Sequence, residues 1–101
     1  MMSHLEYMAR SFAVLESLPQ HTAFGIVSQL AHLRQSPRMG ATLGPRFPKL
    51  KDFRQILYKR VMRVIYEFDE YENVVYILAI QDCRQKLPSA RHLKRDNPNG
   101  T

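Results

Sequence analysis

Two strand-like segments joined by a short polar turn constrain the fold of this chain more than any other feature. Residues 61–68 (VMRVIYEF) alternate with a period of two, which places four apolar side chains on one face: Met62, Val64, Tyr66 and Phe68. Residues 74–81 (VVYILAIQ) are apolar on both faces, as in a central strand that is covered from both sides. The residues between them, 69–73 (DEYEN), are polar. The pattern predicts an antiparallel hairpin.

The first 35 residues have helical rather than strand periodicity. Residues 5–18 are expected to form a helix whose apolar positions are Leu5, Met8, Phe12 and Leu15, and Ser3 and Glu6 match a capping box at its start. A second helix is expected over residues 21–35, with an apolar face made of Phe24, Val27, Leu30 and Ala31. Pro19 and Pro37 end the two helices, because the residue before a proline avoids the α conformation.

The middle of the chain is expected to be a loop followed by a strand. Residues 36–50 hold three prolines and two glycines with no period, which indicates a long basic loop, and residues 52–59 (DFRQILYK) alternate as a strand does. The predicted fold class is therefore α+β, with an N-terminal helical hairpin packed on a small antiparallel β-sheet. We expect one domain over residues 1–95 and a disordered tail over residues 96–101.

Several functional classes are excluded by the composition. The single cysteine, Cys83, has no partner for a disulfide within the chain, which favours a reducing, cytoplasmic location. No apolar run approaches the roughly 18 residues that span a bilayer, so no membrane partner is expected. The sequence also lacks a phosphate-binding glycine motif and any cysteine and histidine pair at metal-ligand spacing. We therefore expect neither a cofactor nor a metal.

The charge of +6 is strongly segregated along the chain. Residues 34–63 contain nine lysines or arginines and one aspartate, whereas residues 64–83 contain five acidic residues and no basic one. Such a distribution attracts polyanions or acidic protein surfaces. A solvated basic surface without any partner is the alternative.

Three arginines are the strongest candidates for a binding site. Arg54 and Arg63 lie on consecutive predicted strands, and Arg84 follows the central strand. If antiparallel pairing brings them to one face of the sheet, their guanidinium groups would bind phosphates or carboxylates bidentately. Pairing of Arg54 and Arg63 with Asp52 or Glu67 remains an alternative.

The second half of the chain resembles the RelE/ParE superfamily of type II toxin–antitoxin toxins. The resemblance rests on four short motifs, at residues 63–66 (RVIY), 69–73 (DEYEN), 74–80 (VVYILAI) and 84–88 (RQKLP), and it covers about residues 5–90. It implies a small basic toxin that inhibits growth or stabilises a plasmid. It also implies a cognate antitoxin whose acidic, partly disordered segment wraps the toxin and is attracted to the basic block.

The two branches of the superfamily imply different targets. ParE toxins inhibit DNA gyrase by protein–protein binding, and the ending at residues 84–88 looks more like that branch, so gyrase is the favoured target. RelE toxins cleave mRNA on the ribosome, and the chain is an enzyme only in this alternative. A non-toxic basic module that binds nucleic acid is a further alternative, and a decayed, inactive toxin is another.

The resemblance also assigns residues. We expect seven residues to bind the target or the antitoxin: Arg46, Lys49, Lys51, Arg54, Arg63, Arg84 and Lys86. If the chain is RelE-like, Arg54, Arg63 and Arg84 would hold the phosphate and the transition state, and His92 is the only late candidate for a base. Two positions depart from the family: only residues 4–7 are available for its first strand, and Gln81 stands where a histidine is common.

Overall fold

The predicted hairpin is formed by β4 (Met62–Asp69) and β5 (Val74–Asp82) in the computed structural model, which describes residues 2–96. The remaining elements are β1 (His4–Tyr7), α1 (Ala9–Ser17), α2 (Gln20–Leu30), β2 (Ala41–Thr42) and β3 (Arg54–Tyr58), with 3₁₀ turns at Ala31–Arg34, Pro48–Leu50 and Ala90–His92. The strand order is β1-β5-β4-β3-β2. The predicted α+β class is confirmed, but the sheet is mixed, since β1 pairs parallel with β5.

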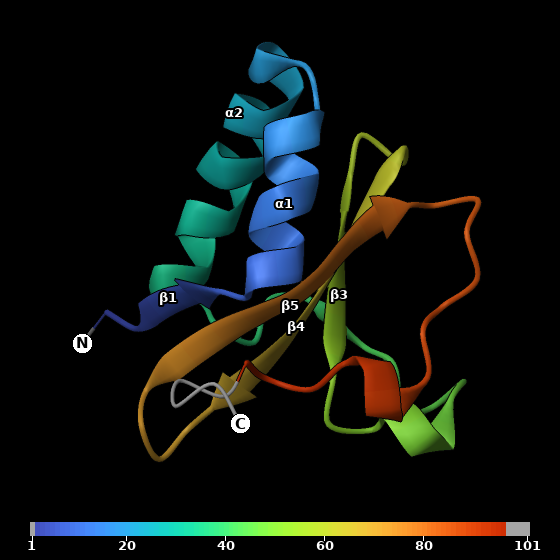
Figure 1. Ribbon diagram of the computed structural model, residues 1–101. Helices are drawn as coiled ribbons and strands as arrows, with labels where there is room; N and C mark the ends of the chain where they lie inside the picture. The colour runs from blue at the N-terminus through green and yellow to red at the C-terminus, as the bar shows by residue number, and fades with distance from the viewer. Residues whose placement is uncertain (1, 97–101) are drawn as a thin grey trace.

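The two helices lie side by side on one face of the sheet, and the chain after β5 returns along the other side (Figure 1). Each face therefore has its own core. The larger core lies under the helices and includes Ile26, Leu30, Leu33, Val64, Tyr66, Val75 and Ile77. The smaller core lies under the loop before β3 and the C-terminal segment, and consists of Met8, Leu43, Leu50, Ile65, Leu78 and Leu93.

The faces predicted for the hairpin are confirmed. Val64 and Tyr66 of β4 belong to the core under the helices, whereas Ile65 between them is fully buried in the smaller core. β5 is buried on both faces, as the sequence predicts for a central strand. The pairing shifts between Ile65 and Tyr66, so that Leu78 is an extra residue of β5, and its side chain packs in the smaller core.

The N-terminus differs from the prediction, because residues 4–7 form β1 and the helix begins only at Ala9. Ser3 is not a helix cap: it is buried, and its hydroxyl donates a hydrogen bond to Oδ1 of Asn73 at 2.7 Å. The backbone N–H of His4 donates to the carbonyl of Asn73 at 3.0 Å. These bonds join the N-terminus to the turn between β4 and β5, and they replace the first turn of the predicted helix.

The buried face of the helical hairpin also differs from the prediction. Phe24 and Val27 are 73% and 42% exposed, and Phe12 of α1 is 55% exposed, whereas Ile26 and Leu30 are buried against the sheet. α2 carries two overlapping apolar stripes, and packing selects between them. Gly25 lies directly against the ring of Tyr58, where a Cβ would come within 2.8 Å of Cζ, so the stripe next to Gly25 is the one that approaches the sheet.

The C-terminal segment is packed as far as the structure describes it. Asp96 accepts a hydrogen bond from the backbone N–H of Ala9 at 2.6 Å, and residues 97–101 of the predicted tail lie outside the described residues. None of the helices within residues 2–96 is long and apolar enough to cross a membrane.

Candidate functional site

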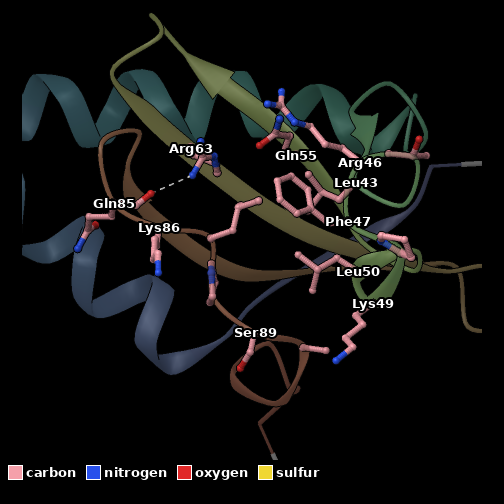
Figure 2. A pocket seen from close by; sticks show the side chains of 15 residues that line it. Leu43, Arg46, Phe47, Lys49, Leu50, Gln55, Arg63, Gln85, Lys86 and Ser89 are labelled. Atoms are coloured by element: carbon pink, nitrogen blue, oxygen red, sulfur yellow. Dashed lines mark hydrogen bonds between the residues drawn. The ribbon is translucent and has the colours of Figure 1, made fainter.

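An open groove of about 1030 Å³ lies on the face of the sheet that the helices do not cover. Its floor is formed by Gln55 of β3 and Arg63 of β4, one wall by residues 42–50, and the other wall by residues 85–90 (Figure 2). The first wall is the loop that the prolines and glycines predicted, held in shape by the burial of Leu43 and Leu50. A loop and a chain terminus thus form a cleft over a rigid sheet, an arrangement typical of binding sites.

The groove is lined by positive charge. Four of the residues around it are cationic, Arg46, Lys49, Arg63 and Lys86, and none of its described lining residues is an aspartate or a glutamate. With no carboxylate to neutralise them, these side chains favour an anionic ligand. Phe47 adds an aromatic ring on the same wall as Arg46 and Lys49 (Figure 2).

Arg63 is the most constrained of these cations. Its Nη1 donates to Oε1 of Gln81 and to the backbone carbonyl of Gln85, both at 3.4 Å. Its Nε is buried and has no hydrogen-bond partner within residues 2–96. The guanidinium is therefore oriented over the groove by two long hydrogen bonds, and it retains unused donor capacity and has no counterion within residues 2–96.

Gln55 and Gln81 flank Arg63 on the neighbouring strands. Oε1 of Gln55 is buried, and it too lacks a partner in the described part of the chain. Gln81 is directly paired with Arg63 in the sheet, and its Nε2 donates to the carbonyl of Lys86 at 3.1 Å. Gln81 thus holds Arg63 on one side and the wall at Lys86 on the other.

The predicted convergence of three arginines is wrong. β3 pairs Arg54 with Tyr66 and Leu57 with Arg63, and positions 66 and 63 of β4 point to opposite faces. Arg54 therefore lies on the helix side, where its Nη1 donates to the carbonyls of Arg38 and Gly40 at 3.0 and 2.8 Å. Its role in the fold is to fix the start of the long loop.

The other residues predicted to bind the target or the antitoxin lie partly inside and partly outside the groove. The Arg84 side chain is 90% exposed and pairs with Asp82 at 3.0 Å; this hydrogen bond raises the pKa of Arg84 and lowers that of Asp82. Lys51 is exposed and does not line the groove. Arg46, Lys49, Arg63 and Lys86 are thus the four predicted binding residues that the fold brings together.

His92 stands beside the groove rather than in it. Its Nδ1 is hydrogen-bonded to the hydroxyl of Ser89 at 2.8 Å, and Ser89 lines the groove. Among the residues that line the described groove, none is a histidine, a tyrosine or a carboxylate. The lining can therefore hold and stabilise negative charge.

The acidic turn is partly neutralised by a residue that the sequence did not single out. Arg95 contacts Glu67 at 3.0 Å and Asp69 at 3.2 Å, and its guanidinium lies 3.9 Å from the centre of the Tyr76 ring. A backbone N–H of the turn, followed by Arg95, holds the pKa of Asp69 below its usual value. Glu67 therefore pairs with the C-terminal segment, and not with Arg54 or Arg63 as one alternative had it.

Gln55, Phe47, Gln85 and Ser89 also line the groove, although the sequence did not indicate them as site residues. The alternation of residues 52–59 places Gln55 on the other face of the strand from Arg54, and this is the only indication of its position that the sequence offers. No group of three histidine, cysteine, aspartate or glutamate side chains arranged for a metal ion occurs within residues 2–96.

Comparison with known proteins gives structural matches only. No family model and no curated protein matches the sequence. A free double arginine-to-alanine mutant of the E. coli toxin RelE matches with a TM-score of 0.70 and 17% identity, over 83% of this chain and 86% of that one. RelBE2, a toxin–antitoxin complex from Mycobacterium tuberculosis, matches with 0.69 and 20%, over 81% and 99%.

An archaeal RelE–RelB complex from Pyrococcus horikoshii matches less closely, with a TM-score of 0.56 and 18% identity over 85% of this chain and all of that one. The bacterial and archaeal matches each span more than four fifths of both chains. At these identities the likeness concerns the fold. The helical hairpin packed on the mixed sheet is therefore the fold of the RelE toxins.

Proposed function

We propose that this chain is the toxin of a type II toxin–antitoxin system and that, like RelE toxins, it cleaves mRNA on the ribosome. The observation that supports this proposal is the groove on a RelE-like fold, in which Arg63 lies among further cations and has no counterion in the described part of the chain. A basic cleft with an aromatic side chain on its wall is suited to an RNA strand, because cations bind phosphates and a ring stacks on a base.

The sequence argument that favoured gyrase as the target is weakened by the positions of residues 84–88 in the fold. That reading depended on residues 84–88, but Arg84 is exposed and bound to Asp82, whereas Lys86 and Pro88 line the groove. Most of this short motif thus contributes to the cleft. The fold matches named above are RelE toxins and RelE–RelB complexes, which favours the nuclease over the gyrase inhibitor.

The chemistry open to such a groove is attack of an RNA 2′-hydroxyl on the adjacent phosphate. The new P–O bond forms as the bond to the 5′-oxygen of the next nucleotide breaks, and the proton lost by the 2′-hydroxyl passes through solvent water to that 5′-oxygen, which leaves a 2′,3′-cyclic phosphate and a free 5′-hydroxyl. Negative charge develops on the phosphoryl oxygens, and donors placed at that charge typically contribute about 10²–10³-fold each to the rate. Arg63 and Lys86 both line the groove and are our candidates for such donors; Gln81 is hydrogen-bonded to the guanidinium of Arg63 and to the backbone carbonyl of Lys86.

The partner that follows from this proposal is an antitoxin with an acidic segment. Such a segment would be attracted to Arg46, Lys49, Arg63 and Lys86, and by covering them it would block the RNA. Two of the matched structures, from M. tuberculosis and P. horikoshii, are complexes of a toxin of this fold with its antitoxin.

The proposal is tested with purified protein, programmed ribosomes and a labelled message, with gyrase supercoiling measured in parallel. We expect cleavage of the ribosome-bound message and no effect on supercoiling. Arg63→Gln should lose most of the cleavage, whereas Arg84→Gln, which removes the same charge outside the groove, should retain it. Loss of supercoiling without cleavage would establish the gyrase reading instead, and the absence of both activities would refute the toxin proposal.

A further inference from the structure

The groove has an apolar part as well as a cationic one. Phe47 and Pro48 line it from the first wall, and Leu87 and Pro88 line it from the second. Arg63 lies on the floor between the two walls. A nucleotide combines the same two characters, because its phosphate is an anion and its base presents a flat face on which an aromatic ring stacks.

Both walls are anchored in the same core. Leu43 and Leu50 of the first wall are buried in the smaller core, and Leu87 and Ala90 of the second wall pack against that core. The separation of the walls is therefore set by the packing of the fold. The space between them exists before any ligand binds, as is usual for a binding site.

The ring of Phe47 is presented by a tightly bonded loop. The N–H of Phe47 donates to the carbonyl of Leu43 at 2.8 Å, and its carbonyl accepts from the N–H of Leu50 at 2.7 Å. The loop also closes on itself at Gly44, where a Cβ would come within 3.0 Å of the Cα of Lys51. Phe47 is nevertheless 39% exposed. A ring that is already fixed in place loses little conformational freedom when a ligand binds.

Phe47 is the exposed phenylalanine that lies among cations. Arg46 and Lys49 flank it in the loop and line the groove, and neither has a carboxylate at ion-pair distance within residues 2–96. The more exposed phenylalanines of the described chain, Phe12 and Phe24, belong to the helices on the other face of the sheet. An aromatic ring between unpaired cations is the combination with which proteins bind single-stranded nucleic acid.

We propose that Phe47 stacks on one unpaired nucleobase, which lies between its ring and the wall at Leu87 and Pro88 while Arg63 holds a neighbouring phosphate. This inference rests on the proposed function and specifies its substrate, because a base that enters the groove is not paired in a duplex. An apolar side chain of an acidic protein segment would also fit between the walls. The exposed ring favours the base, since an aliphatic residue would serve a protein side chain equally well.

The test separates stacking on the base from attraction to the phosphates. Binding of oligouridylate is compared with binding of an abasic ribose–phosphate strand of the same length, which carries the same charge, over a range of salt concentrations. Phe47→Leu keeps an apolar side chain in the groove without a ring, and Phe47→Tyr keeps the ring. Phe24→Leu is the matched control, because it removes an exposed ring on the other face of the sheet. The melting temperature of each variant is measured in parallel.

We expect the unmodified chain to bind oligouridylate about tenfold more tightly than the abasic strand, the order expected for one stacked base. Phe47→Leu should bind the two strands within about twofold of each other, whereas Phe47→Tyr and Phe24→Leu should keep the preference. The slope of log K against log salt should be the same for all four proteins, because no charge is removed. Each variant should melt within about 5 °C of the unmodified chain, because the replaced rings are partly or mostly exposed.

A preference for the strand with bases that Phe47→Leu abolishes and Phe47→Tyr retains supports the inference. Equal binding of the two strands by the unmodified chain, binding of neither strand at low salt, or a preference that survives in Phe47→Leu overturns it. Cleavage of ribosome-bound message tests the proposed function separately. A chain that cleaves without preferring bases refutes the inference alone, and a chain that prefers bases without cleaving refutes the proposed function alone.

Discussion

Arg63 and Arg54 belong to neighbouring strands and carry the same charge, yet we expect their replacement by glutamine to have opposite effects. Arg63 has two hydrogen bonds of 3.4 Å, a buried Nε without a partner in the described chain, and no counterion. Its removal eliminates two weak bonds and one partly desolvated charge. These contributions nearly cancel, so the free energy of unfolding should change by less than about 1 kcal/mol. Cleavage should fall by about 10²–10³-fold, as when a donor to a developing charge is lost.

Arg54→Gln should destabilise the fold and spare the chemistry. Its Nη1 donates to two backbone carbonyls at 3.0 and 2.8 Å, and hydrogen bonds from charged donors contribute about 1.5–3 kcal/mol each. Because one of the two bonds is exposed, we expect a loss near the lower limit, about 3 kcal/mol in total. For a chain of this size that lowers the melting temperature by at least about 10 °C.

The assay combines urea denaturation of each variant with its cleavage rate on programmed ribosomes, measured at a temperature where both variants are folded. The two arginines should separate completely, one affecting only the rate and the other only the stability. The reasoning is refuted if Arg63→Gln is the more destabilised variant, or if folded Arg54→Gln loses as much cleavage as Arg63→Gln.

Three further predictions concern the frame around the groove. Tyr66→Phe removes the hydroxyl that accepts from the buried N–H of Gly40 at 2.9 Å, so urea denaturation should show a loss of about 2 kcal/mol, and a loss below about 0.5 kcal/mol would contradict this role. Gly25→Ala should lower the melting temperature, because the added Cβ would meet the ring of Tyr58, and this clash outweighs the roughly 1 kcal/mol by which alanine is a better helix former than glycine. A higher melting temperature would disprove that close approach. The pKa of Asp69 is held below 3.8, so its ionised form stabilises the fold above that pH, and this stabilisation disappears as the pH falls through the lowered pKa. Asp69→Asn should therefore flatten the decline of the melting temperature below about pH 4, and a parallel decline in both proteins would exclude the effect.

Much of the fold could be predicted because it depends on neighbours in the sequence. The alternation in residues 61–68 predicted that Val64 and Tyr66 share a face, and they do. The prolines and glycines of residues 36–50 predicted the loop that becomes a wall of the groove. The helical stripe of α2 was ambiguous, since Phe24 and Ile26 belong to two overlapping stripes, and only contact with Tyr58 distinguishes them.

The candidate site could be predicted only in part, because the faces of β3 and β4 are related through the turn between them. The pairing of Tyr58 with Met62 leaves three residues, 59–61, between the strands and places Arg54 and Arg63 on opposite faces, whereas a connection one residue shorter or longer would reverse that relation. Lys-Arg is not a dipeptide that indicates a turn. The sequence of this turn therefore concealed the register.

The sequence by itself determined most of the helical and extended segments after residue 8, the place of residues 74–81 in the interior of the sheet and the separation of basic from acidic blocks, because these depend on periodicity and composition within a few residues. The tertiary structure decided the rest. It converted residues 4–7 into a strand through bonds to Asn73, moved Arg54 out of the site, and joined Arg63 to Lys86 through Gln81. Each of these outcomes depends on pairing and packing between residues far apart in the chain, whose free energy no local pattern contains.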